Sequence, residues 1–274
     1  MPQSARHIAL EGSSNLRDVG GYATVDGRRL RWNMIYRSGA LSKLSSADWA
    51  WMVKRNIGVV CDLRSGEERA LAPTGWQGGG QTRHVGIAYE AELIFGTLAR
   101  SGDPTSIGEM GKSLYPLFPK LLAPSFRMMF DALVEGHTPV IVHCSAGQDR
   151  TGLAIGLVLT ALGVPRELIF QDYLMSPGLR RVDNEIDPSA MVHLAESNVV
   201  AGFYMDLAKR RGADAFHPRP LVNPRGEPLL LDAFRAIEAE WGSIENYLDR
   251  ELGMGVERIT MLRHICLEDA IRDG

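Results

Sequence analysis

The chain has 274 residues, 45% of them hydrophobic and 23% charged, and its formal net charge at pH 7 is −3. That length suits one large domain, or a core with an added subdomain, that buries a substantial apolar interior. The charge excludes the strongly basic surface typical of nucleic-acid-binding proteins, and no apolar run predicts a membrane-spanning helix. Three widely spaced cysteines argue against a disulfide framework and favour a reducing compartment. We therefore expect a cytoplasmic protein, and export without a recognisable signal stays open.

Short apolar runs alternate with helical patterns up to residue 139. We expect strands at residues 34–36, 59–62 and 83–87. We expect helices at residues 45–56, from residue 65 for a short stretch, and at residues 124–134. The first two helices begin with capping boxes, Ser45 with Asp48 and Ser65 with Glu68. The three glycines at 78–80 predict a flexible connection with no role in phosphate binding.

Residues 139–152 carry the chemistry and read Pro-Val-Ile-Val-His-Cys-Ser-Ala-Gly-Gln-Asp-Arg-Thr-Gly. An apolar, β-branched run ends in Cys144, five small or polar residues follow, and Arg150 opens an apolar helix at 153–162. A cysteine over a helix N-terminus is stabilised as a thiolate by the N–H groups and the dipole there. The same N–H groups, turned inward by the short loop, form a nest that accepts phosphate oxygens. The segment therefore predicts a phosphate-ester hydrolase site.

We assign the chemical steps to this loop. Cys144 is expected to attack phosphorus in line and form a phosphocysteine, which water then hydrolyses. Arg150 presents a planar fork that can bind two phosphoryl oxygens and follow their charge into the transition state. The predicted phosphate-binding residues are Ser145, Ala146, Gly147, Gln148, Asp149 and Arg150. No metal or cofactor is expected, and the histidines show no ligand spacing.

The rest of the chain is predicted to be helical, at residues 165–175, 189–211, 229–241, 243–252 and 256–273. The earlier alternation of strands and helices implies an α/β fold with a mostly parallel central sheet flanked by helices. Sites in such sheets form beyond the carboxyl ends of the strands, where Cys144 and Asp62 are both expected.

Five further blocks of sequence, together with the loop, resemble a known protein family. They are residues 14–22, 36–42, 62–65, 171–174 and 242–248. Together these blocks and the loop resemble the cysteine-dependent protein tyrosine and dual-specificity phosphatases, in particular a bacterial and fungal branch that includes the mycobacterial protein tyrosine phosphatase B. The resemblance implies a phosphotyrosine phosphatase-like fold. It covers most of the chain from residue 14 to about residue 262, with no block at 89–119 or 177–228.

The expected organisation is a single phosphatase domain over residues 1–274. Within it we expect an α/β catalytic core at 1–176, a C-terminal helical lid or subdomain at 177–228, and further helices at 229–274. In the resembled branch a helical pair covers the active site, and residues 189–211 are the candidate. The alternative is that their apolar face only packs on the core. A lid would shield the thiolate from oxidants.

The general acid is not obvious from the spacing of the residues, because the loop after residue 87 offers no aspartate until Asp103. A relative in the resembled branch is thought to use the residue that matches Asp149, so we expect Asp149 to protonate the leaving group. The alternative is that Asp149 only orients Arg150 or the loop backbone. The Thr151 hydroxyl, which lies next to the sulfur in related loops, is expected to stabilise the thiolate of Cys144 as it leaves.

Two residues expected near Cys144, His143 and Cys61, each have two interpretations. His143 suggests a Cys-His protease, but successive strand residues point to opposite faces, so we favour a structural role in hydrogen-bonding the loop. Cys61 is expected to be a small buried hydrophobe. Its place also resembles that of a resolving cysteine in tensin-like lipid phosphatases, so a reversible disulfide between Cys61 and Cys144 is the alternative.

Charged residues elsewhere have structural and functional interpretations. Asp62 and Arg64 follow a strand and either line the pocket or have a structural role, and we favour the structural role slightly. Arg17 and Asp18 are expected to pin the N-terminal segment by an internal ion pair.

Gln148 bears on the substrate. In the resembled branch this position is usually lysine, which can hold a second phosphate of a phosphoinositide. Without that charge a phosphotyrosine-containing protein or peptide becomes the first choice, with inorganic phosphate as product. A phosphoinositide or dual-specificity phosphatase is the alternative, and a weakly active phosphoprotein-binding module is the second. Neither nucleic acid nor integral membrane association is expected.

Overall fold

Five short strands form the central sheet of the structure, a computed structural model that describes residues 6–76, 82–100, 114–185 and 187–270. They are β1 (Arg17–Asp18), β3 (Ile35–Ser38), β4 (Val59–Asp62), β5 (Arg83–Val85) and β6 (Val140–His143), in the order β1-β3-β6-β4-β5. β3, β6, β4 and β5 are parallel, and β1 is antiparallel to β3. The predicted α/β fold with a mostly parallel sheet is confirmed. The predicted connection at 78–80 lies outside the described residues.

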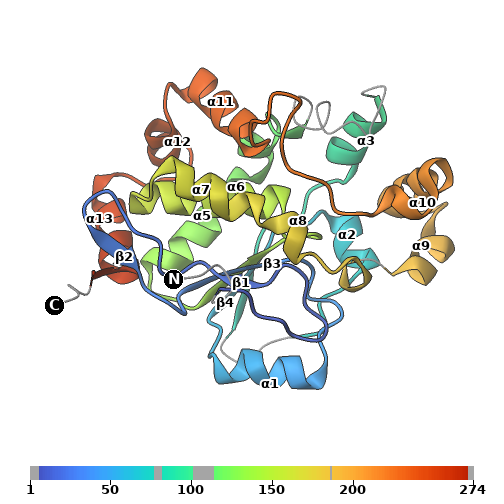
Figure 1. The fold of residues 1–274 in the computed structure, drawn as a ribbon, viewed down its shortest axis with the longest axis horizontal. Helices are drawn as coiled ribbons and strands as arrows, with labels where there is room; N and C mark the ends of the chain where they lie inside the picture. Colours follow the sequence, from blue (N-terminus) through green and yellow to red (C-terminus); the bar gives the residue numbers. More distant parts are fainter. Residues whose placement is uncertain (1–5, 77–81, 101–113, 186, 271–274) are drawn as a thin grey trace.

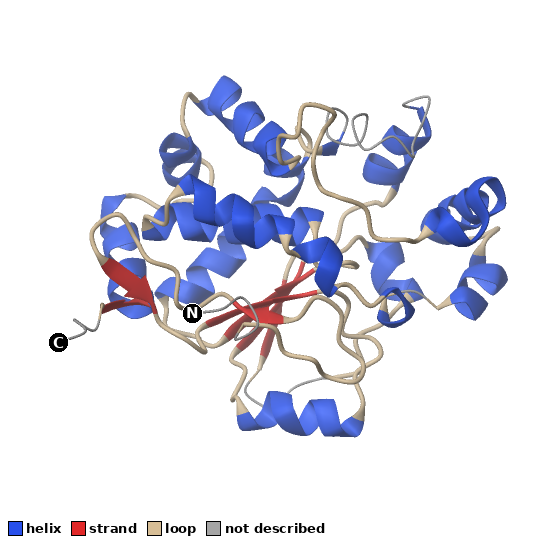
Figure 2. Cartoon of the chain, viewed as in Figure 1, coloured by secondary structure: helices blue, strands red, loops and turns tan. Residues whose placement is uncertain are grey.

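Helices cover both faces of this sheet (Figures 1 and 2). Val140 and Val142 of β6 belong to one apolar cluster with α5 (Phe118–Val134) and α6 (Asp149–Leu162). Ile141 belongs to a second cluster with Met52 of α1 (Ser46–Lys54), on the opposite face. Since β6 is buried on both faces, its functional groups gather beyond its carboxyl end.

Both predicted capping boxes are confirmed. Ser45 begins α1, with its hydroxyl 3.3 Å from the Asp48 nitrogen and its own N–H 3.0 Å from Asp48 Oδ2. Ser65 and Glu68 do the same at α2 (Gly66–Leu71), with distances of 3.1 and 2.9 Å. These bonds satisfy N–H groups that a helix start otherwise leaves free.

The helices after α6 fall into two groups. α7 (Arg166–Leu174), α11 (Leu230–Trp241), α12 (Ile244–Arg250) and α13 (Val256–Cys266) pack on α5 or α6. α9 (Pro188–Leu194) and α10 (Val199–Arg211) pack instead on α2 and α3 (Glu92–Arg100), as Figure 1 shows. α8 (Ser176–Leu179) follows α7, and two short 3-10 helices (Val182–Asn184 and Gly212–Ala215) flank the α9–α10 pair. The division into residues 1–176, 177–228 and 229–274 stays a prediction.

Two predicted helices have different boundaries in the structure, and the differences involve a proline in one case and an asparagine in the other. α5 begins at Phe118 rather than at residue 124, so Pro124 lies inside it. Pro119 occupies the first turn instead, where a missing N–H has no cost. The helix predicted at 189–211 is two helices, because the side chain of Asn198 accepts from the backbone nitrogens of Val200 and Ala201 and starts α10 anew.

The C-terminal prediction was also wrong in part. The helix expected over 256–273 ends at Cys266, and the chain continues as strand β7 (Leu267–Asp269). β7 pairs antiparallel with β2 (Arg28–Leu30) in a separate two-stranded sheet. The paired residues are more than 230 positions apart in the sequence. The local pattern of apolar residues cannot indicate such a pairing, and by itself it favoured a longer helix.

Candidate active site

The predicted loop connects β6 to α6 at the carboxyl edge of the sheet. Gly147 lies in it with φ of +65°, and a Cβ there would come within 2.4 Å of the Ser38 backbone. Only glycine therefore allows the loop to pass so close to β3. Cys144 lies at the start of the loop and is 2% exposed. The Cys144 side chain is covered in this structure rather than open to solvent.

The carbonyl groups of the loop are held from outside by neighbouring segments. Ser145 O accepts from the Ala40 nitrogen at 2.8 Å. The side-chain amide of Asn15 donates to the Ala146 and Gly147 oxygens at 3.1 and 2.8 Å. These contacts pull the carbonyl oxygens away from the centre of the loop.

The N–H groups of the loop are available by contrast. In the described part of the chain, the backbone nitrogens from Ser145 to Arg150 donate no hydrogen bond. Because a peptide N–H points opposite to its carbonyl oxygen, the outward carbonyls leave these donors facing inward. This is the arrangement that accepts an oxyanion.

A buried cluster of charges supports the loop from behind. Asp172 of α7 pairs with Arg17 at 3.1 Å and with Arg37 at 2.5 Å, and all three side chains are at most 1% exposed. Burial would raise the pKa of Asp172, but the two guanidinium groups outweigh it and lower the pKa to about 2. Arg37 also donates to Gly147 O at 2.8 Å. Two cations and one anion leave a surplus positive charge beneath the anion-binding loop.

This cluster corrects the predicted ion pair between Arg17 and Asp18. Arg17 pairs with Asp172 instead. Asp18 accepts hydrogen bonds from the backbone nitrogens of Gly20 and Asn33, both at 2.7 Å. Adjacent strand residues point to opposite sides, which keeps Arg17 and Asp18 apart.

Arg150 makes two parallel bonds to Glu68 of α2. Its Nη1 lies 2.5 Å from Oε2 and its Nη2 2.7 Å from Oε1 of that carboxylate. Glu68 Oε1 also accepts from the Ser145 hydroxyl at 2.5 Å, and Arg150 donates to the Tyr89 hydroxyl at 2.6 Å. Burial would raise the pKa of Glu68, but Arg150 and these hydrogen bonds together lower it. The sequence indicated only a capping role for Glu68. Its bond to Arg150 joins residues 82 positions apart, so no local pattern predicts it.

Asp149 begins α6 and lines a cavity beside the loop. Its Oδ1 accepts from the hydroxyl of Tyr115, which in turn contacts the hydroxyl of Tyr173. Thr151 Oγ1 is buried and has no hydrogen-bond partner in the described residues. Thr151 therefore makes no hydrogen bond to the Cys144 sulfur in this structure, and its expected role stays a prediction.

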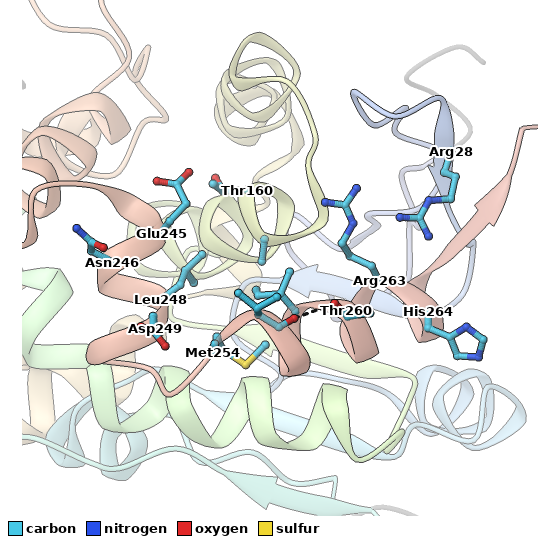
Figure 3. A pocket seen from close by; sticks show the side chains of 14 residues that line it. Arg28, Thr160, Glu245, Asn246, Leu248, Asp249, Met254, Thr260, Arg263 and His264 are labelled. Atoms are coloured by element: carbon cyan, nitrogen blue, oxygen red, sulfur yellow. Dashed lines mark hydrogen bonds between the residues drawn. The ribbon is translucent and has the colours of Figure 1, made fainter.

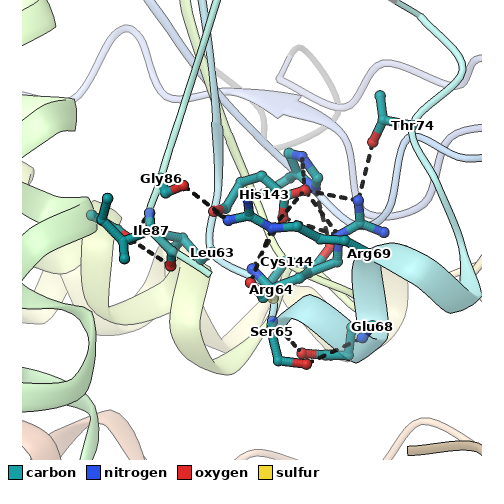
Figure 4. A network of polar contacts seen from close by, with 12 residues as sticks. Leu63, Arg64, Ser65, Glu68, Arg69, Thr74, Gly86, Ile87, His143 and Cys144 are labelled. Carbon is teal, nitrogen blue, oxygen red and sulfur yellow. Dashed lines mark hydrogen bonds and ion pairs between the residues drawn. The ribbon is translucent and has the colours of Figure 1, made fainter. Parts of the chain in front are cut away.

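Asp62, Arg64 and His143 form a polar network at the ends of β4 and β6, and Figure 4 shows Arg64 and His143 within it. Asp62 accepts from Arg64 Nε at 2.9 Å and from Nη2 at 2.8 Å. His143 Nδ1 lies 3.3 Å from Cys144 O, and its Nε2 is 3.7 Å from Asp62 Oδ2. Burial is the main reason that the pKa of His143 falls to about 4, so the ring is neutral. Asp62 and Arg64 do not line the cavity beside the loop.

All three cysteines are free and buried. Cys61 is fully buried on β4, paired in register with Val142, and burial raises the pKa of its thiol. Its sulfur lies 4.0 Å from the Ser125 oxygen. The disulfide between Cys61 and Cys144 is not formed and stays a prediction.

The cavity beside the loop has a volume of about 230 Å³. Ser145, Ala146, Gln148 and Asp149 line it on the loop side. An aromatic group also lines the cavity, with neighbouring rings 5.2–5.9 Å apart; it consists of Phe95, Phe203, Tyr204 and Phe216. Arg180 also lines the cavity, pairs with Glu185 at 2.5 Å, and donates to Gln148 Oε1 at 3.4 Å.

A larger cavity of about 820 Å³ lies elsewhere, between α12, α13 and the C-terminal end of α6 (Figure 3). Arg28 and Arg263 stand on one side of it, and Glu245 and Asp249 on the other. None of the loop residues 144–150 is among its described lining residues, whereas Ser145, Ala146, Gln148 and Asp149 line the smaller cavity. The larger of the two cavities is therefore not the one beside the loop.

The described residues contain neither a candidate membrane span nor a candidate metal cluster. No helix in this part of the chain is long and apolar enough to cross a membrane. No cluster of three or more histidine, cysteine, aspartate or glutamate side chains suited to a metal ion occurs in the same residues.

Comparison with known proteins adds an independent line of evidence. The model of the tyrosine phosphatase family matches residues 8–268. A Cupriavidus necator protein whose name describes a tyrosine-protein phosphatase is 29% identical over 266 residues, covering 94% of this chain and 88% of that protein. The triple specificity protein phosphatase PtpB of Mycobacterium tuberculosis is 28% identical over 287 residues, covering 94% and 98%. A tyrosine-protein phosphatase of Nostoc commune is 25% identical over 234 residues, covering 83% and 72%.

Proposed function

The chain belongs to the tyrosine phosphatase family, and from that premise we propose that it hydrolyses phosphotyrosine in proteins or peptides through a phosphocysteine at Cys144. The observation that carries this proposal is the loop itself. Its carbonyl oxygens are bound from outside by Asn15 and Arg37, and its N–H groups are left for an oxyanion next to Cys144 and Arg150.

The reaction runs in two steps. The Cys144 thiolate attacks phosphorus, the sulfur–phosphorus bond forms, and the bond to the tyrosine oxygen breaks. Asp149 gives its proton to that leaving oxygen, while the loop N–H groups and Arg150 stabilise the charge on the phosphoryl group. Water then attacks phosphorus, Asp149 takes up a proton, and inorganic phosphate leaves as the thiolate of Cys144 is restored. Thr151 is proposed to stabilise that thiolate once its hydroxyl turns toward the sulfur.

Glu68 has a supporting role in this scheme. A guanidinium held by two parallel bonds to a buried carboxylate keeps a fixed plane. The Arg150 fork is therefore oriented before the substrate arrives, which saves the cost of ordering a long side chain during binding.

The covered state of Cys144 requires movement for substrate entry. α9 and α10 lie on the cavity side, where Met191, Val200 and Phe203 line the cavity together with the loop. We propose that residues 177–228 form a lid on the catalytic core of residues 1–176. Hydrogen exchange should then be faster in α9 and α10 than in β6 and α6. Equal protection of both regions would remove the lid from the scheme.

The shape of the cavity supports an aromatic substrate. The rings that line the cavity can pack against the phenyl ring of phosphotyrosine, which a phosphoserine side chain lacks. A second candidate, a dual-specificity or phosphoinositide phosphatase, is favoured by one observation. Arg180 places a cation beside Gln148, at the position where the lysine of the resembled branch would act. The Mycobacterium tuberculosis relative is named a triple specificity enzyme.

A kinetic panel tests the proposal. Wild-type protein and the Cys144→Ser variant would be compared on phosphotyrosine peptides, phosphoserine peptides and phosphoinositide vesicles. The proposal expects the highest kcat/KM on phosphotyrosine and no turnover by the variant. Preference for phosphoinositides would favour the second candidate, and binding without any turnover would favour a phosphoprotein-binding module.

We also propose a cytoplasmic location. The supporting observation is that Cys61, Cys144 and Cys266 are all buried and unpaired. Thiols in this state suit a reducing compartment.

A further inference from the structure

Two tyrosine hydroxyls connect Asp149 to the interior of the protein. Tyr115, just before α5, donates to Asp149 Oδ1, and the hydroxyl of Tyr173 on α7 contacts the hydroxyl of Tyr115. Both tyrosine side chains are fully buried. Burial, followed by the nearby charge of Asp149, raises the pKa of each phenol well above its ordinary value, so both keep their protons.

The number of protons fixes the direction of these hydrogen bonds. A phenol has one proton to donate. In the described residues, the Tyr173 hydroxyl has no hydrogen-bond partner other than Tyr115. If Tyr115 donated to Tyr173, the Tyr173 proton would be buried without an acceptor, which is costly. The favoured order is therefore Tyr173 to Tyr115 to Asp149, with Oδ1 always the acceptor.

The other oxygen of Asp149 faces a different environment. No hydrogen bond to Oδ2 is formed by the described residues, and the Asp149 side chain lines the cavity beside the loop. A proton on Oδ1 would compete with the donor proton of Tyr115. Only Oδ2 is free to carry the acidic proton into the cavity.

Gly152 provides the space that this arrangement needs. A Cβ at position 152 would lie 2.7 Å from Cδ2 and 3.0 Å from Cε2 of the Tyr173 ring. Those distances are shorter than side chains tolerate, so the close approach of Tyr173 to the first turn of α6 depends on this glycine. Tyr173 also follows Asp172, which holds Arg17 and Arg37. α7 therefore supports the loop through two neighbouring residues.

We propose that Tyr115 and Tyr173 are positioning residues that keep the acidic proton of Asp149 on Oδ2, facing the leaving group in the cavity. The inference rests on the proposed function, because it takes Asp149 as the general acid. It adds a requirement for two residues that touch no substrate.

The test compares two leaving groups. Steady-state kcat and KM would be measured with phenyl phosphate, a poor leaving group that needs a proton, and with p-nitrophenyl phosphate, an activated one. The variants are Asp149→Asn, Tyr115→Phe and Tyr173→Phe. Tyr36→Phe is the control, because Tyr36 is as deeply buried but packs on the opposite face of the sheet and bonds to Asn33.

We expect Tyr115→Phe to lower kcat for phenyl phosphate about tenfold, a part of the ~10²–10⁴-fold that a positioned general acid supplies. The kcat for p-nitrophenyl phosphate and both KM values should stay within about twofold, since the acid contributes less to activated leaving groups. Tyr173→Phe should show the same selectivity with a smaller loss, because Tyr115 still reaches Asp149. Tyr36→Phe should match wild type.

The outcomes separate this inference from the proposed function. If wild-type protein hydrolyses neither ester, the proposed function fails. If Asp149→Asn is selective but both tyrosine variants match wild type, or lose activity equally on the two esters, the positioning role alone is overturned. If circular dichroism shows that Tyr115→Phe is unfolded, the test rests on Tyr173→Phe. A selective loss of kcat on phenyl phosphate then supports the positioning role, and its absence overturns it.

Discussion

The loop between β6 and α6 is held differently on its two sides. Behind it, Arg17, Arg37 and Asp172 are at most 1% exposed and bonded to one another and to the loop. In front of it, α9 and α10 bury few side chains, and Val192 is 60% exposed. Charged and hydrogen-bonded side chains dominate the back, although Arg37 Nε has no partner among the described residues, whereas α9 and α10 line the cavity mainly with apolar side chains. This contrast is what the proposed lid requires, since the loop keeps its shape while the helices that cover it are held more weakly.

The largest expected effect is on stability, at the back of the loop. Asp172→Asn leaves two buried guanidinium groups without their anion, and breaking a buried pair in this way costs roughly 3–5 kcal/mol. The free energy of unfolding, measured by urea denaturation, should fall by that amount. Asp131→Asn is the matched control, since its pair with Arg258 is 49% and 39% exposed and should contribute ~0–1 kcal/mol. Similar losses in both variants would contradict the contrast between buried and exposed pairs.

A second change acts on loop geometry. Gly147→Ala adds a Cβ 2.4 Å from the Ser38 backbone and should displace the loop. A misplacement of about 1 Å lowers catalysis on the order of 10²-fold, which kcat/KM with p-nitrophenyl phosphate would report. Gly136→Ala is the control that separates backbone strain from a steric clash. Gly136 also has a positive φ, +76°, but a Cβ there would have no atom within 4 Å. Equal activity losses in the two variants would show that the close approach to β3 is unimportant.

The pH dependence of stability follows from Asp172. Its folded pKa of about 2 lies below the unfolded value of about 3.9, so the unfolded state binds more protons between them. The stabilisation is therefore present above about pH 4 and is lost as pH falls toward 2, by roughly 2–3 kcal/mol. Urea titrations from pH 6 to pH 2 should show this loss, and Asp172→Asn should lack that part of it. An unchanged pH slope in the variant would mean that Asp172 is not the titrating group.

The smallest expected effect on stability lies at the front. Phe203→Ala removes ring contacts to Phe95 and Tyr204 at 5.2 and 5.7 Å and should cost ~1–2 kcal/mol, because the ring is only partly buried. Alkylation of Cys144 by iodoacetamide, followed by mass spectrometry, should become several-fold faster as the cover loosens.

Phe170→Ala is the control for that change, since Phe170 is also partly buried but packs on Phe234 of α11. It should leave the alkylation rate of Cys144 unchanged. If both variants accelerate alkylation equally, the aromatic wall is not a specific cover.

Local signals in the sequence predicted much of this molecule. The capping boxes at Ser45 and Ser65 and the strand–loop–helix around Cys144 depend on residues a few positions apart, and the structure has all three. The break between α9 and α10 was not predicted. The apolar residues on both sides of Asn198 fit one helical pattern, and only the structure shows that the Asn198 side chain caps a new helix.

The supporting contacts of the site could not be predicted in this way. Glu68 meets Arg150 across 82 positions, Arg37 meets Gly147 across 110, and Tyr115 meets Asp149 across 34. Spacing along the chain does not encode such pairs, because the fold alone brings them together. Sequence blocks around residues 14–22, 36–42 and 171–174 indicated that these segments matter, and the structure assigns them to the back of the loop.

The central claim is that Cys144 is the nucleophile of an anion-binding loop. Rapid acid quenching during turnover of p-nitrophenyl phosphate, followed by peptide mapping with mass spectrometry, tests it most directly. The account predicts a phosphate adduct on the peptide that carries Cys144, and neither adduct nor turnover in Cys144→Ser. Turnover by that variant, or phosphate on a different residue, would contradict the account.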